Sequence, residues 1–440
     1  MTSQRRTFLK QVSAGTVALA ATTATTSTTA AARTSNADQV VLGIIGPGGM
    51  GSNHVRHLAR RDDVEIAWVC DVDSVRAGKA AEIVTDEKKK RPEITADMRH
   101  VLDDDRVDAV FIATPDHWHA PASLLALDAG KHVYVEKPCC HNIHEGRLMA
   151  DAVQRTGKCL QVGTQSRSTE FIEEAMQRLH EGEIGEILVA KAWNSQRRGS
   201  IGKQKPSNPP AHLDFENWVG PAPMVPYQSN LLHGIWRWWY DFGCGDIGND
   251  GVHDIDVALW GLGVTDHPVR ASCFGSKLFF DDDQQFPDTQ YAVFDYAADA
   301  AGGKPRQMIF EQRIWSPYTL EGYENGEAFY GTEGCMVMGH SKGWRLYGPR
   351  DKLIEERVGQ VNLVAHHSNF LDCVRGKATK LNADITAGRL SATLVHLANI
   401  SARTGRVLNF NPKSEQIIGD EESNAMVARR YRDHWATPAT

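Results

Sequence analysis

The sequence predicts an α/β protein whose first domain is a doubly wound parallel sheet and whose second domain is built differently. Between residues 40 and 160, short apolar runs alternate with helical stretches, as strands of a parallel sheet alternate with crossover helices. After about residue 160, strand-like segments follow one another without helices between them. The chain has 440 residues, and about 400 of them fit two domains of ordinary size.

The first apolar run, Val40 to Ile45, leads directly into the glycine-rich sequence GPGGMG. Between a strand and a helix, the first glycine permits a tight turn, the second lets the backbone approach a pyrophosphate, and the third allows close packing. The pattern predicts a dinucleotide-binding loop; the structural alternative is a glycine turn that binds no dinucleotide. The loop residues are Gly46, Gly48, Gly49, Met50 and Gly51.

A second strand, Val64 to Cys70, ends at Asp71, where a carboxylate can accept hydrogen bonds from an adenosine ribose. A negative charge there would repel a 2′-phosphate, so the sequence favours NAD over NADP. Arg76 lies close enough along the chain to soften that preference.

Two further strands are expected from Asp108 to Thr114 and from Lys131 to Val135, with a helix from Pro121 to Ala129 between them. Ligands of open parallel sheets bind beyond the carboxyl ends of the strands, so the segments that follow these strands should face the glycine loop. The residues expected at the cofactor from these segments are Thr114, Pro115, His117, His119, Glu136 and Lys137.

GPGGMG, ATPDHWHA and VYVEKP, in this order and spacing, resemble the glucose-fructose oxidoreductase, inositol dehydrogenase and MocA (Gfo/Idh/MocA) family. The resemblance continues through QVGTQSR, NWVGPAP and GCGDIGNDGVHDID, and so covers almost all of the chain after its N-terminus. It implies a Rossmann domain at 38–158 and an α+β domain at 159–440 with a large, open, mostly antiparallel sheet. That second domain would cover the nicotinamide and form a homo-oligomer, a dimer or a tetramer, and its C-terminal helices can pack back on the first domain.

The residues support this division independently. Ile187 to Trp193, Tyr291 to Tyr296 and Gln307 to Ile314 are strand-like, and the intervening 197–233 is rich in Pro, Gly and Asn without clear periodicity. Such a long loop in a compact domain usually has a function, so we expect it to cover the substrate; a dimer contact is the alternative. An amphipathic pattern predicts a helix at 386–403, and the charged segment 421–433 is expected to form a closing helix.

Two residues are candidates for the chemistry. Oxidising a carbinol needs a base for the hydroxyl proton and a positive group for the developing alkoxide. The resemblance places Lys137 between substrate and nicotinamide, makes His253 the acid/base, and adds Gln165 to the cofactor site. The structural alternatives are a surface lysine before a proline and a hydrogen-bonded helix histidine.

One position departs from the family pattern. Many members carry Asp four residues before the histidine, whereas this chain has Asn249, followed by Asp250. Both can lie on the same side of a helix as His253, and Asn249 could fix its tautomer or bind a sugar hydroxyl, but it cannot act as a base. A metal site from the aspartates around His253 is possible by composition; neighbouring helix residues point in different directions, so we predict none.

Just before this motif, 235–242 concentrates tryptophans with one arginine. Aromatic rings stack on the apolar faces of sugars, and arginine can bind hydroxyls or a carboxylate. Trp236 and Arg237 are therefore substrate candidates, as is Arg167 with Asn249, Asp250 and His253; a purely packing role for the aromatic residues is the alternative.

The N-terminus resembles a twin-arginine export signal. Arg5 and Arg6 precede an uncharged stretch rich in Ala and Thr, and Ala30 to Ala32 offers a cleavage site; a disordered tail is the alternative. Residues 1–32 would then be a signal peptide, and the protein would fold in the cytoplasm, cross through the twin-arginine machinery and act in the periplasm or otherwise outside, with no integral membrane segment after cleavage.

Export and a cofactor found in the cytoplasm are compatible if the dinucleotide is bound tightly and regenerated within each cycle. We therefore expect an oxidoreductase acting on a sugar or glycoside with tightly bound NAD. One alternative is an NAD-dependent glycoside hydrolase working by transient oxidation, elimination, hydration and re-reduction; another is a non-catalytic dinucleotide-binding regulator. A net charge of −7 gives no electrostatic reason to expect nucleic acid.

Overall fold

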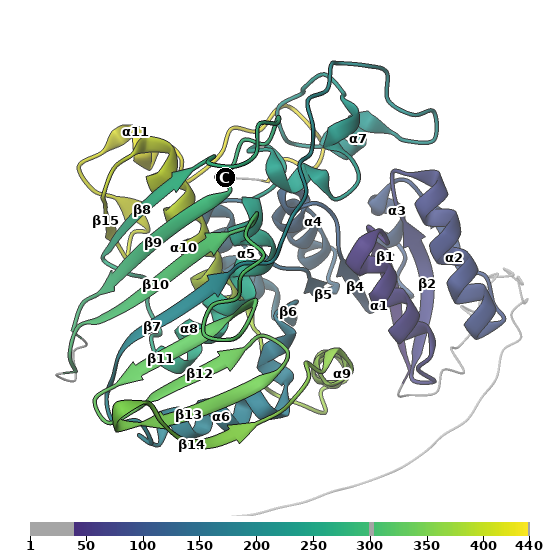
Figure 1. Ribbon diagram of the computed structural model, residues 1–440. Helices are drawn as coiled ribbons and strands as arrows, with labels where there is room; N and C mark the ends of the chain where they lie inside the picture. Colours follow the sequence, from purple (N-terminus) through teal and green to yellow (C-terminus); the bar gives the residue numbers. More distant parts are fainter. Residues whose placement is uncertain (1–38, 299–302, 439–440) are drawn as a thin grey trace, which may run out of the picture. The chain divides into compact units, whose positions relative to one another are not determined.

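The computed structural model describes residues 39–298 and 303–438, in which two sheets are flanked by helices (Figure 1). The predicted signal peptide, 1–32, lies outside the described residues. Among those that are described, no helix combines the length and apolar character required to cross a bilayer.

The first sheet is a six-stranded parallel sheet in the order β3-β2-β1-β4-β5-β6, with helices packed on both faces. The order reverses between β1 and β4, so their carboxyl ends open a crevice at that edge of the sheet. The strands are β1 Val40–Ile45, β2 Val64–Cys70, β3 Glu93–Thr95, β4 Ala109–Ile112, β5 His132–Val135 and β6 Leu160–Val162. The helices are α1 Gly49–Ala59, α2 Ser74–Lys88, α3 Met98–Leu102, α4 Asp116–Asp128 and α5 Ile143–Thr156.

The second sheet has ten strands in the order β14-β13-β12-β11-β7-β10-β9-β8-β15-β16. All neighbouring strands are antiparallel except β7 and β10, which are parallel. The strands are β7 Ile187–Asn194, β8 Arg270–Ser276, β9 Thr289–Tyr296, β10 Arg306–Arg313, β11 Asn325–Gly331, β12 Cys335–Gly339, β13 Gly343–Gly348, β14 Lys352–Arg357, β15 Leu408–Asn411 and β16 Gln416–Ile417. The helices are α6 Glu170–His180, α7 Phe215–Val219, α8 Val252–Leu262, α9 Leu363–Val374, α10 Ile385–Thr404 and α11 Glu421–Asn424.

The predicted fold class, a Rossmann sheet followed by a domain with a large and mostly antiparallel sheet, is confirmed. The first sheet extends slightly further than expected, because β6 lies beyond the predicted domain boundary at residue 158. The C-terminal part also returns to the first domain: Phe370 of α9 packs edge-on against Phe111 of β4 and Tyr134 of β5, with ring centroids 5.5 and 5.8 Å apart.

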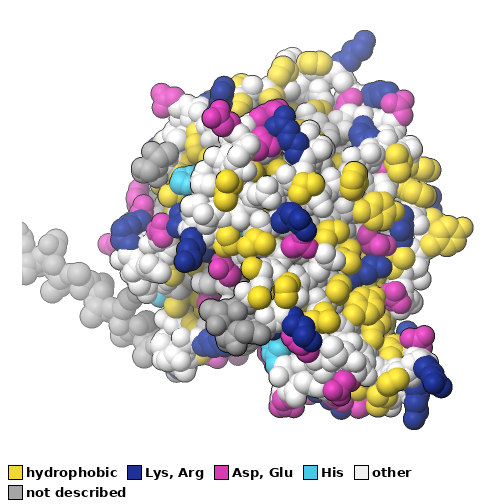
Figure 2. All heavy atoms as spheres, turned by 90° about the vertical axis from the view of Figure 1, so that its left-hand side faces the viewer, with side chains coloured by type: hydrophobic (Ala, Val, Ile, Leu, Met, Phe, Trp, Pro, Cys, Tyr) yellow, Lys and Arg dark blue, Asp and Glu magenta, His cyan; other side chains and the backbone are white. Residues whose placement is uncertain are grey.

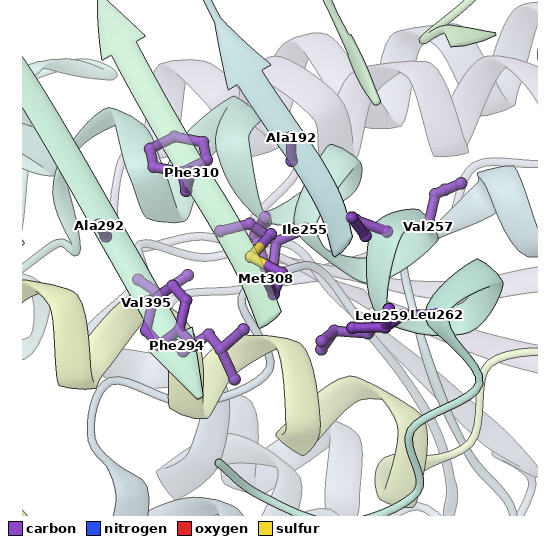
Figure 3. Packing of buried hydrophobic residues seen from close by; sticks show 14 of the residues in the cluster. Ala192, Ile255, Val257, Leu259, Leu262, Ala292, Phe294, Met308, Phe310 and Val395 are labelled. Atoms are coloured by element: carbon purple, nitrogen blue, oxygen red, sulfur yellow. The ribbon is translucent and has the colours of Figure 1, made fainter. Parts of the chain in front are cut away.

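The core of the second domain lies between its sheet and the helices α8 and α10 (Figure 3). Strand residues alternate in burial, so that Phe294 and Phe310 point inward to Ile255 and Val395 on the helices. Outward residues of these and neighbouring strands are partly or largely exposed, including Tyr291 of β9 and Phe274 of β8. In Figure 2, apolar side chains are scattered among charged ones over the face that lies to the left in Figure 1.

Two predicted helices have different bounds. The helix expected at 121–129 begins at Asp116 and so contains Pro121. A proline leaves the carbonyl four residues earlier without its helical partner, here that of His117, and Arg429 Nη2 donates to that oxygen at 2.6 Å. The helix predicted at 421–433 is wrong beyond Asn424, because the chain that follows is drawn into contacts of Arg429 with Glu145 and of Arg432 with Gly220.

Candidate functional site

The glycine loop connects β1 to α1 in a conformation that requires glycine. Gly46 has φ +79°, and a Cβ atom there would lie 2.8 Å from the amide nitrogen of Thr114. A Cβ atom on Gly51 would meet the carbonyl oxygen of Gly46, so this glycine permits the close strand–helix packing. In contrast, a Cβ atom on Gly49, the first residue of α1, would meet nothing within 4 Å. The space beside this first residue of the helix is therefore open, as an approaching diphosphate would need, whereas the Arg76 guanidinium lies against the preceding Gly48.

A cavity opens in front of this loop and brings together segments far apart in the sequence. It is bounded by the carboxyl ends of the first sheet, by the loop that contains α7 and by the aromatic segment 235–238. Of the residues predicted for the site, it is lined by Gly46, Gly48, Gly49, Met50, Asp71, Arg76, Thr114, Pro115, His119, Glu136, Lys137, Trp236, Arg237 and Asn249. The predicted residues that do not line it are Gly51, His117, Gln165, Arg167, Asp250 and His253.

Asp71 and Arg76 lie on the side of the cavity next to the loop. Asp71 Oδ1 accepts a hydrogen bond of 2.9 Å from the amide of Asp73. Burial raises the pKa of Asp71 to about 6, and this effect exceeds the opposing ones of that hydrogen bond and of Arg76. The Arg76 guanidinium occupies the place where a Gly48 side chain would be. Both groups are thus held beside the glycine loop: Asp71 can accept hydrogen bonds from hydroxyl groups, and Arg76 carries a positive charge.

Lys137 reaches the cavity from the end of β5. Its Nζ donates a hydrogen bond of 2.6 Å to the backbone carbonyl of Asn249, and this bond ties β5 of the first sheet to the turn that precedes α8. Glu136 is buried behind it with Oε1 2.9 Å from His54 Nε2. Burial alone would raise the pKa of Glu136, but the His54 hydrogen bond and the nearby positive groups lower it below its ordinary value. The lysine therefore stands beside a buried carboxylate.

The segment Ile247–Gly251 forms a π-helical turn before α8. Asn249 Nδ2 donates to Asp246 Oδ1 at 3.0 Å, while Asp250 forms an ion pair with Arg198. Arg198 also contacts Asp246 at 3.1 Å. The Asp250 carboxylate is therefore held by Arg198 outside the cavity lining, whereas Asn249 remains at the cavity wall.

His253 is buried on α8 next to a second histidine. The ring centroids of His253 and His340 are 5.2 Å apart, and His340 Nδ1 lies 3.0 Å from Asp254 Oδ1. Burial, followed by the positive Lys137 and by His340, lowers the pKa of His253 well below its ordinary value, so the ring is neutral at pH 7. Its Nδ1 has no hydrogen-bond partner among the described residues.

Three predicted residues do not line the cavity, and two of them are engaged elsewhere. His117 is fully buried, and its ring nitrogens contact the carbonyls of Phe242 and Trp218 at 3.3 and 3.1 Å, so we no longer assign it to the cofactor. Arg167 forms a two-pronged ion pair with Asp256, at 2.6 and 3.1 Å, that leaves it outside the cavity wall. Gln165 lies in a short 3₁₀ turn after β6 and also stays outside the lining.

His119 lines the cavity but is fixed by the backbone. Its Nδ1 lies 2.7 Å from the carbonyl oxygen of Pro138 and its Nε2 lies 2.9 Å from that of Thr114. The ring thereby links the ends of β4 and β5, so its position supports a role in shaping the site.

The loop predicted to cover the substrate contributes a wall of the cavity. Trp218 on α7 is 5% exposed and packs against Phe242, with centroids 4.8 Å apart, so the loop has a small core of its own. Trp236 and Arg237 line the cavity from the next segment, and the buried Arg237 Nε has no partner among the described residues. An arginine donor and an aromatic ring therefore face the same space, as a polar and ring-shaped ligand would need.

Sequence reasoning missed Arg198, Trp218 and His340, and also His233, which lines the cavity with its Nε2 3.1 Å from Asp73 Oδ2. Arg198 and His340 follow no motif; only the pairing of distant strands brings them to the turn before α8. Trp218 belongs to the NWVGPAP segment, which carries the family resemblance but gives the tryptophan no role of its own. Among the described residues no group of three His, Cys, Asp or Glu side chains could hold a metal ion.

Two family models match the chain. One, described as the oxidoreductase family with NAD-binding Rossmann fold (Gfo/Idh/MocA), matches residues 40–164. The other, described as the C-terminal alpha/beta domain of the same oxidoreductase family, matches residues 189–290 and 354–437. Together they cover most of the chain and meet at the cavity described above.

Among curated proteins, the chain is 31% identical over 160 residues to a glycosyl hydrolase family 109 protein of Shewanella pealeana, covering 35% of each chain. It is 29% identical over 158 residues to an alpha-N-acetylgalactosaminidase of Shewanella oneidensis, covering 35% of this chain and 34% of that protein. The match thus spans about a third of the length of these relatives.

Among solved structures, it resembles the WlbA dehydrogenase of Bordetella pertussis in complex with NADH and UDP-GlcNAcA, with a TM-score of 0.62 and 18% identity. That match covers 85% of this chain and 99% of the other. A similar match, with a TM-score of 0.63 and 15% identity over 84% of this chain and 100% of the other, is to the aldose-aldose oxidoreductase of Caulobacter crescentus. At these identities the likeness establishes the fold.

Proposed function

Because the chain belongs to the Gfo/Idh/MocA oxidoreductase family, we propose that it oxidises a sugar or glycoside with a tightly bound nicotinamide dinucleotide. The observation that carries the proposal is the composition of the cavity. It joins the glycine loop, the Lys137 ammonium and the Trp236–Arg237 pair in one space. The first would bind a dinucleotide, the second would stabilise an alkoxide, and the third would hold a sugar ring.

The residues present fit a dinucleotide. Open space lies beside Gly49 at the N-terminus of α1, where a diphosphate would bind. Asp71 would contact the adenosine end together with Arg76, whose guanidinium lies against Gly48. When bound, the nicotinamide would supply the acceptor for a hydride from the substrate. The chain itself would orient the sugar hydroxyl toward Lys137, whose charge stabilises the alkoxide. His253 would receive the proton from a position behind the cavity wall, since it is buried and does not line the cavity.

A redox-neutral glycosidase is the second candidate, favoured by the names of the Shewanella relatives. In that reaction transient oxidation of the sugar acidifies a neighbouring C–H, the aglycone is eliminated, water adds and the sugar is reduced again. The same residues would serve both reactions, because each begins with oxidation of a carbinol.

Export and assembly belong to the proposal. A protein carried folded through the twin-arginine pathway to the periplasm would bring its NAD from the cytoplasm and regenerate it within each cycle. Support for a homo-oligomer comes from the outer face of the large sheet, where the cross-strand pair Phe274 and Tyr291 is 82% and 43% exposed.

The choice of NAD over NADP gives a pH-dependent prediction. The Asp71 carboxylate accepts hydrogen bonds from ribose hydroxyls best when it is ionised. Because its pKa is raised to about 6, NAD binding competes with protonation of this carboxylate in acid. We expect the Kd for NAD, measured by calorimetry, to rise about tenfold from pH 7 to pH 5. Asp71→Asn should abolish this dependence and improve NADP binding relative to NAD. Asp62→Asn, on the exposed turn before β2, is the control and should behave like the parent.

The proposed function is tested on the chain purified from a cytoplasm. Bound nucleotide is released and identified by mass, and candidate glycosides are then added to untreated protein while products are followed. Copurified NAD with turnover that needs no added cofactor is the expected result. Free aglycone from one glycoside without a second sugar would assign the glycosidase, and paired oxidised and reduced sugars the oxidoreductase. An empty protein that reacts only with added NAD would contradict the tightly bound cofactor.

A further inference from the structure

The loop that carries α7 reaches the end of the cavity where the adenosine of a dinucleotide would lie. The segments that follow β2 and β3 line the cavity at that end, and they include Asp71, which would contact the ribose. The same cavity is lined by residues of the loop and of the C-terminal tail, namely Leu213, Asn217, Trp218, His233 and Trp435. The function proposed above gives these five residues no role in binding the cofactor.

Two backbone hydrogen bonds join residues 212–214 of the loop to residues 72–74, directly after β2. They run from the amide of Asp214 to the carbonyl of Val72, at 2.9 Å, and from the amide of Ser74 to the carbonyl of His212, at 3.0 Å. Together they make an antiparallel bridge between the two segments, and in Figure 1 the loop accordingly lies next to the end of the first sheet. The bridge adjoins Asp71, so the loop closes the cavity beside the proposed ribose contact.

The side chain of Asp73 fastens the loop a second time. Asp73 is 2% exposed, and its Oδ1 accepts hydrogen bonds from the amides of Val75 and Arg76 in the first turn of α2. Its Oδ2 lies 3.1 Å from His233 Nε2 and 3.5 Å from His212 Nε2. One buried carboxylate thus holds both the helix and two histidines of the loop, and His233 lines the cavity.

The C-terminal tail holds the other part of the loop. Arg432 Nε donates to the carbonyl of Gly220 at 2.6 Å, and Trp435 Nε1 donates to Asn217 Oδ1 at 3.3 Å. The Arg99 guanidinium of α3 lies over the Trp435 ring at 4.6 Å. The loop is therefore joined to the first domain through Asp73 at α2 and through the tail at α3.

These contacts differ in how easily they can separate. At α7 the carbonyl of Trp218 accepts a buried hydrogen bond of 2.9 Å from Trp118 Nε1, and Trp218 belongs to the apolar core of the loop. At the bridge, the side chains of His212 and His233 are 43% and 36% exposed. Water can replace the hydrogen bonds of exposed groups at little cost, so we expect the loop to open at the bridge while α7 stays in place.

We propose that residues 212–214 and His233 form a clasp that retains the dinucleotide, so that bound NAD leaves the cavity only after the clasp has separated from residues 72–74. Asp73 fastens the closed clasp, which holds the adenosine half of the cofactor between the loop and the end of β2. This inference rests on the proposed function, because it concerns the cofactor of the same cavity. It gives tight binding a physical cause, since release of NAD requires the loop to open.

The clasp is tested by locking it with a disulfide. Ser74→Cys and His212→Cys together place two cysteines opposite each other across the bridge, where Cα atoms lie about 5.5 Å apart, a separation that a disulfide spans. Both residues are exposed and neither lines the cavity, so the substitutions leave the surroundings of the cofactor unchanged.

The protein with bound NAD is mixed with excess isotope-labelled NAD, and replacement of the bound nucleotide is followed by mass. The oxidised double variant is expected to exchange its NAD about tenfold or more slowly than the same protein reduced with dithiothreitol. Ser74→Cys alone is the control, and its exchange rate should be the same after both treatments.

His233→Leu tests the fastening from the opposite direction. It removes the donor to Asp73 Oδ2, so NAD should exchange about tenfold faster than in the parent. Because His233 lines the cavity, loss of a contact with NAD itself would give the same acceleration, and the lock separates the two causes. His233→Leu in the oxidised double variant should exchange as slowly as the lock alone. His180→Leu, an exposed histidine that donates to the carbonyl of Trp260, is the matched control and should exchange at the parent rate.

Two results would contradict the proposal in different ways. Equal exchange rates in the oxidised and reduced double variant, with the disulfide verified by mass, would mean that NAD leaves by another route. That result would overturn the clasp and leave the proposed function standing. A chain that neither carries nor binds a nicotinamide dinucleotide would overturn both.

Discussion

Replacing Lys137 by methionine is expected to lower kcat about 10²- to 10⁴-fold while the chain stays folded. The Lys137 ammonium lies at the end of β5 in the cavity lining, where it donates a hydrogen bond of 2.6 Å to the backbone carbonyl of Asn249. Methionine keeps the length and volume of the side chain but removes the charge that an alkoxide needs. Steady-state turnover of the sugar substrate identified from purified protein measures the effect.

Lys191→Met is the matched control. Lys191 pairs with Glu311 at 3.3 Å on the large sheet and does not line the cavity. Its loss should leave kcat near the parent value and lower the unfolding free energy by about 1 to 3 kcal/mol, because the pair is mostly buried. Unchanged turnover in Lys137→Met, with bound NAD still present, would remove Lys137 from the chemistry and leave it as a link between β5 and the turn before α8.

The bounds of strands and helices could be predicted where the local sequence determines them. Buried strands such as Val40–Ile45 and Val64–Cys70 were predicted with their observed bounds, because continuous apolar runs ended by Gly or Asp have few other solutions. The errors came from tertiary contacts. Pro121 predicts a helix start, but Arg429, some 300 residues later, satisfies the carbonyl that the proline leaves free. The charged tail beyond Asn424 has a helical composition, yet its arginines are held by distant acceptors.

The predicted site residues also divide into those that the local sequence places and those whose position depends on tertiary contacts. The glycine loop, Asp71 and Lys137 follow strands of one sheet, so the rule for strand ends brings them together from sequence alone. Residue type within a motif alone indicated three other site residues. The sequence does not show their partners, which are Asp256 for Arg167, Arg198 for Asp250 and backbone carbonyls for His117. Charged groups predicted from motifs are therefore least certain where an ion pair can already satisfy them.

His253→Asn is expected to lower kcat about 10²- to 10⁴-fold, the contribution of a proton acceptor near the carbinol. The ring is neutral because burial, Lys137 and His340 lower its pKa, so it can accept a proton throughout the range in which an ordinary histidine titrates. The parent should accordingly show no loss of kcat from pH 8 down to about 6.5 on account of this residue. His132→Asn, at the opposite end of β5 where burial lowers the pKa of the histidine to about 4, is the control and should leave kcat unchanged.

Stability distinguishes a catalytic role of His253 from a structural one. A histidine whose folded pKa is lowered binds fewer protons in the folded state than in the unfolded chain, so its contribution to folding is present above pH 6.5 and declines as the pH falls below it. His253→Asn should remove that part of the acid sensitivity, seen as a flatter dependence of denaturant midpoint on pH between 7 and about 5. If the variant shows this flatter profile and an unchanged kcat, His253 is a buried structural histidine. If the variant instead loses kcat at pH 8, where the parent ring is neutral and its titration does not affect stability, His253 accepts the substrate proton.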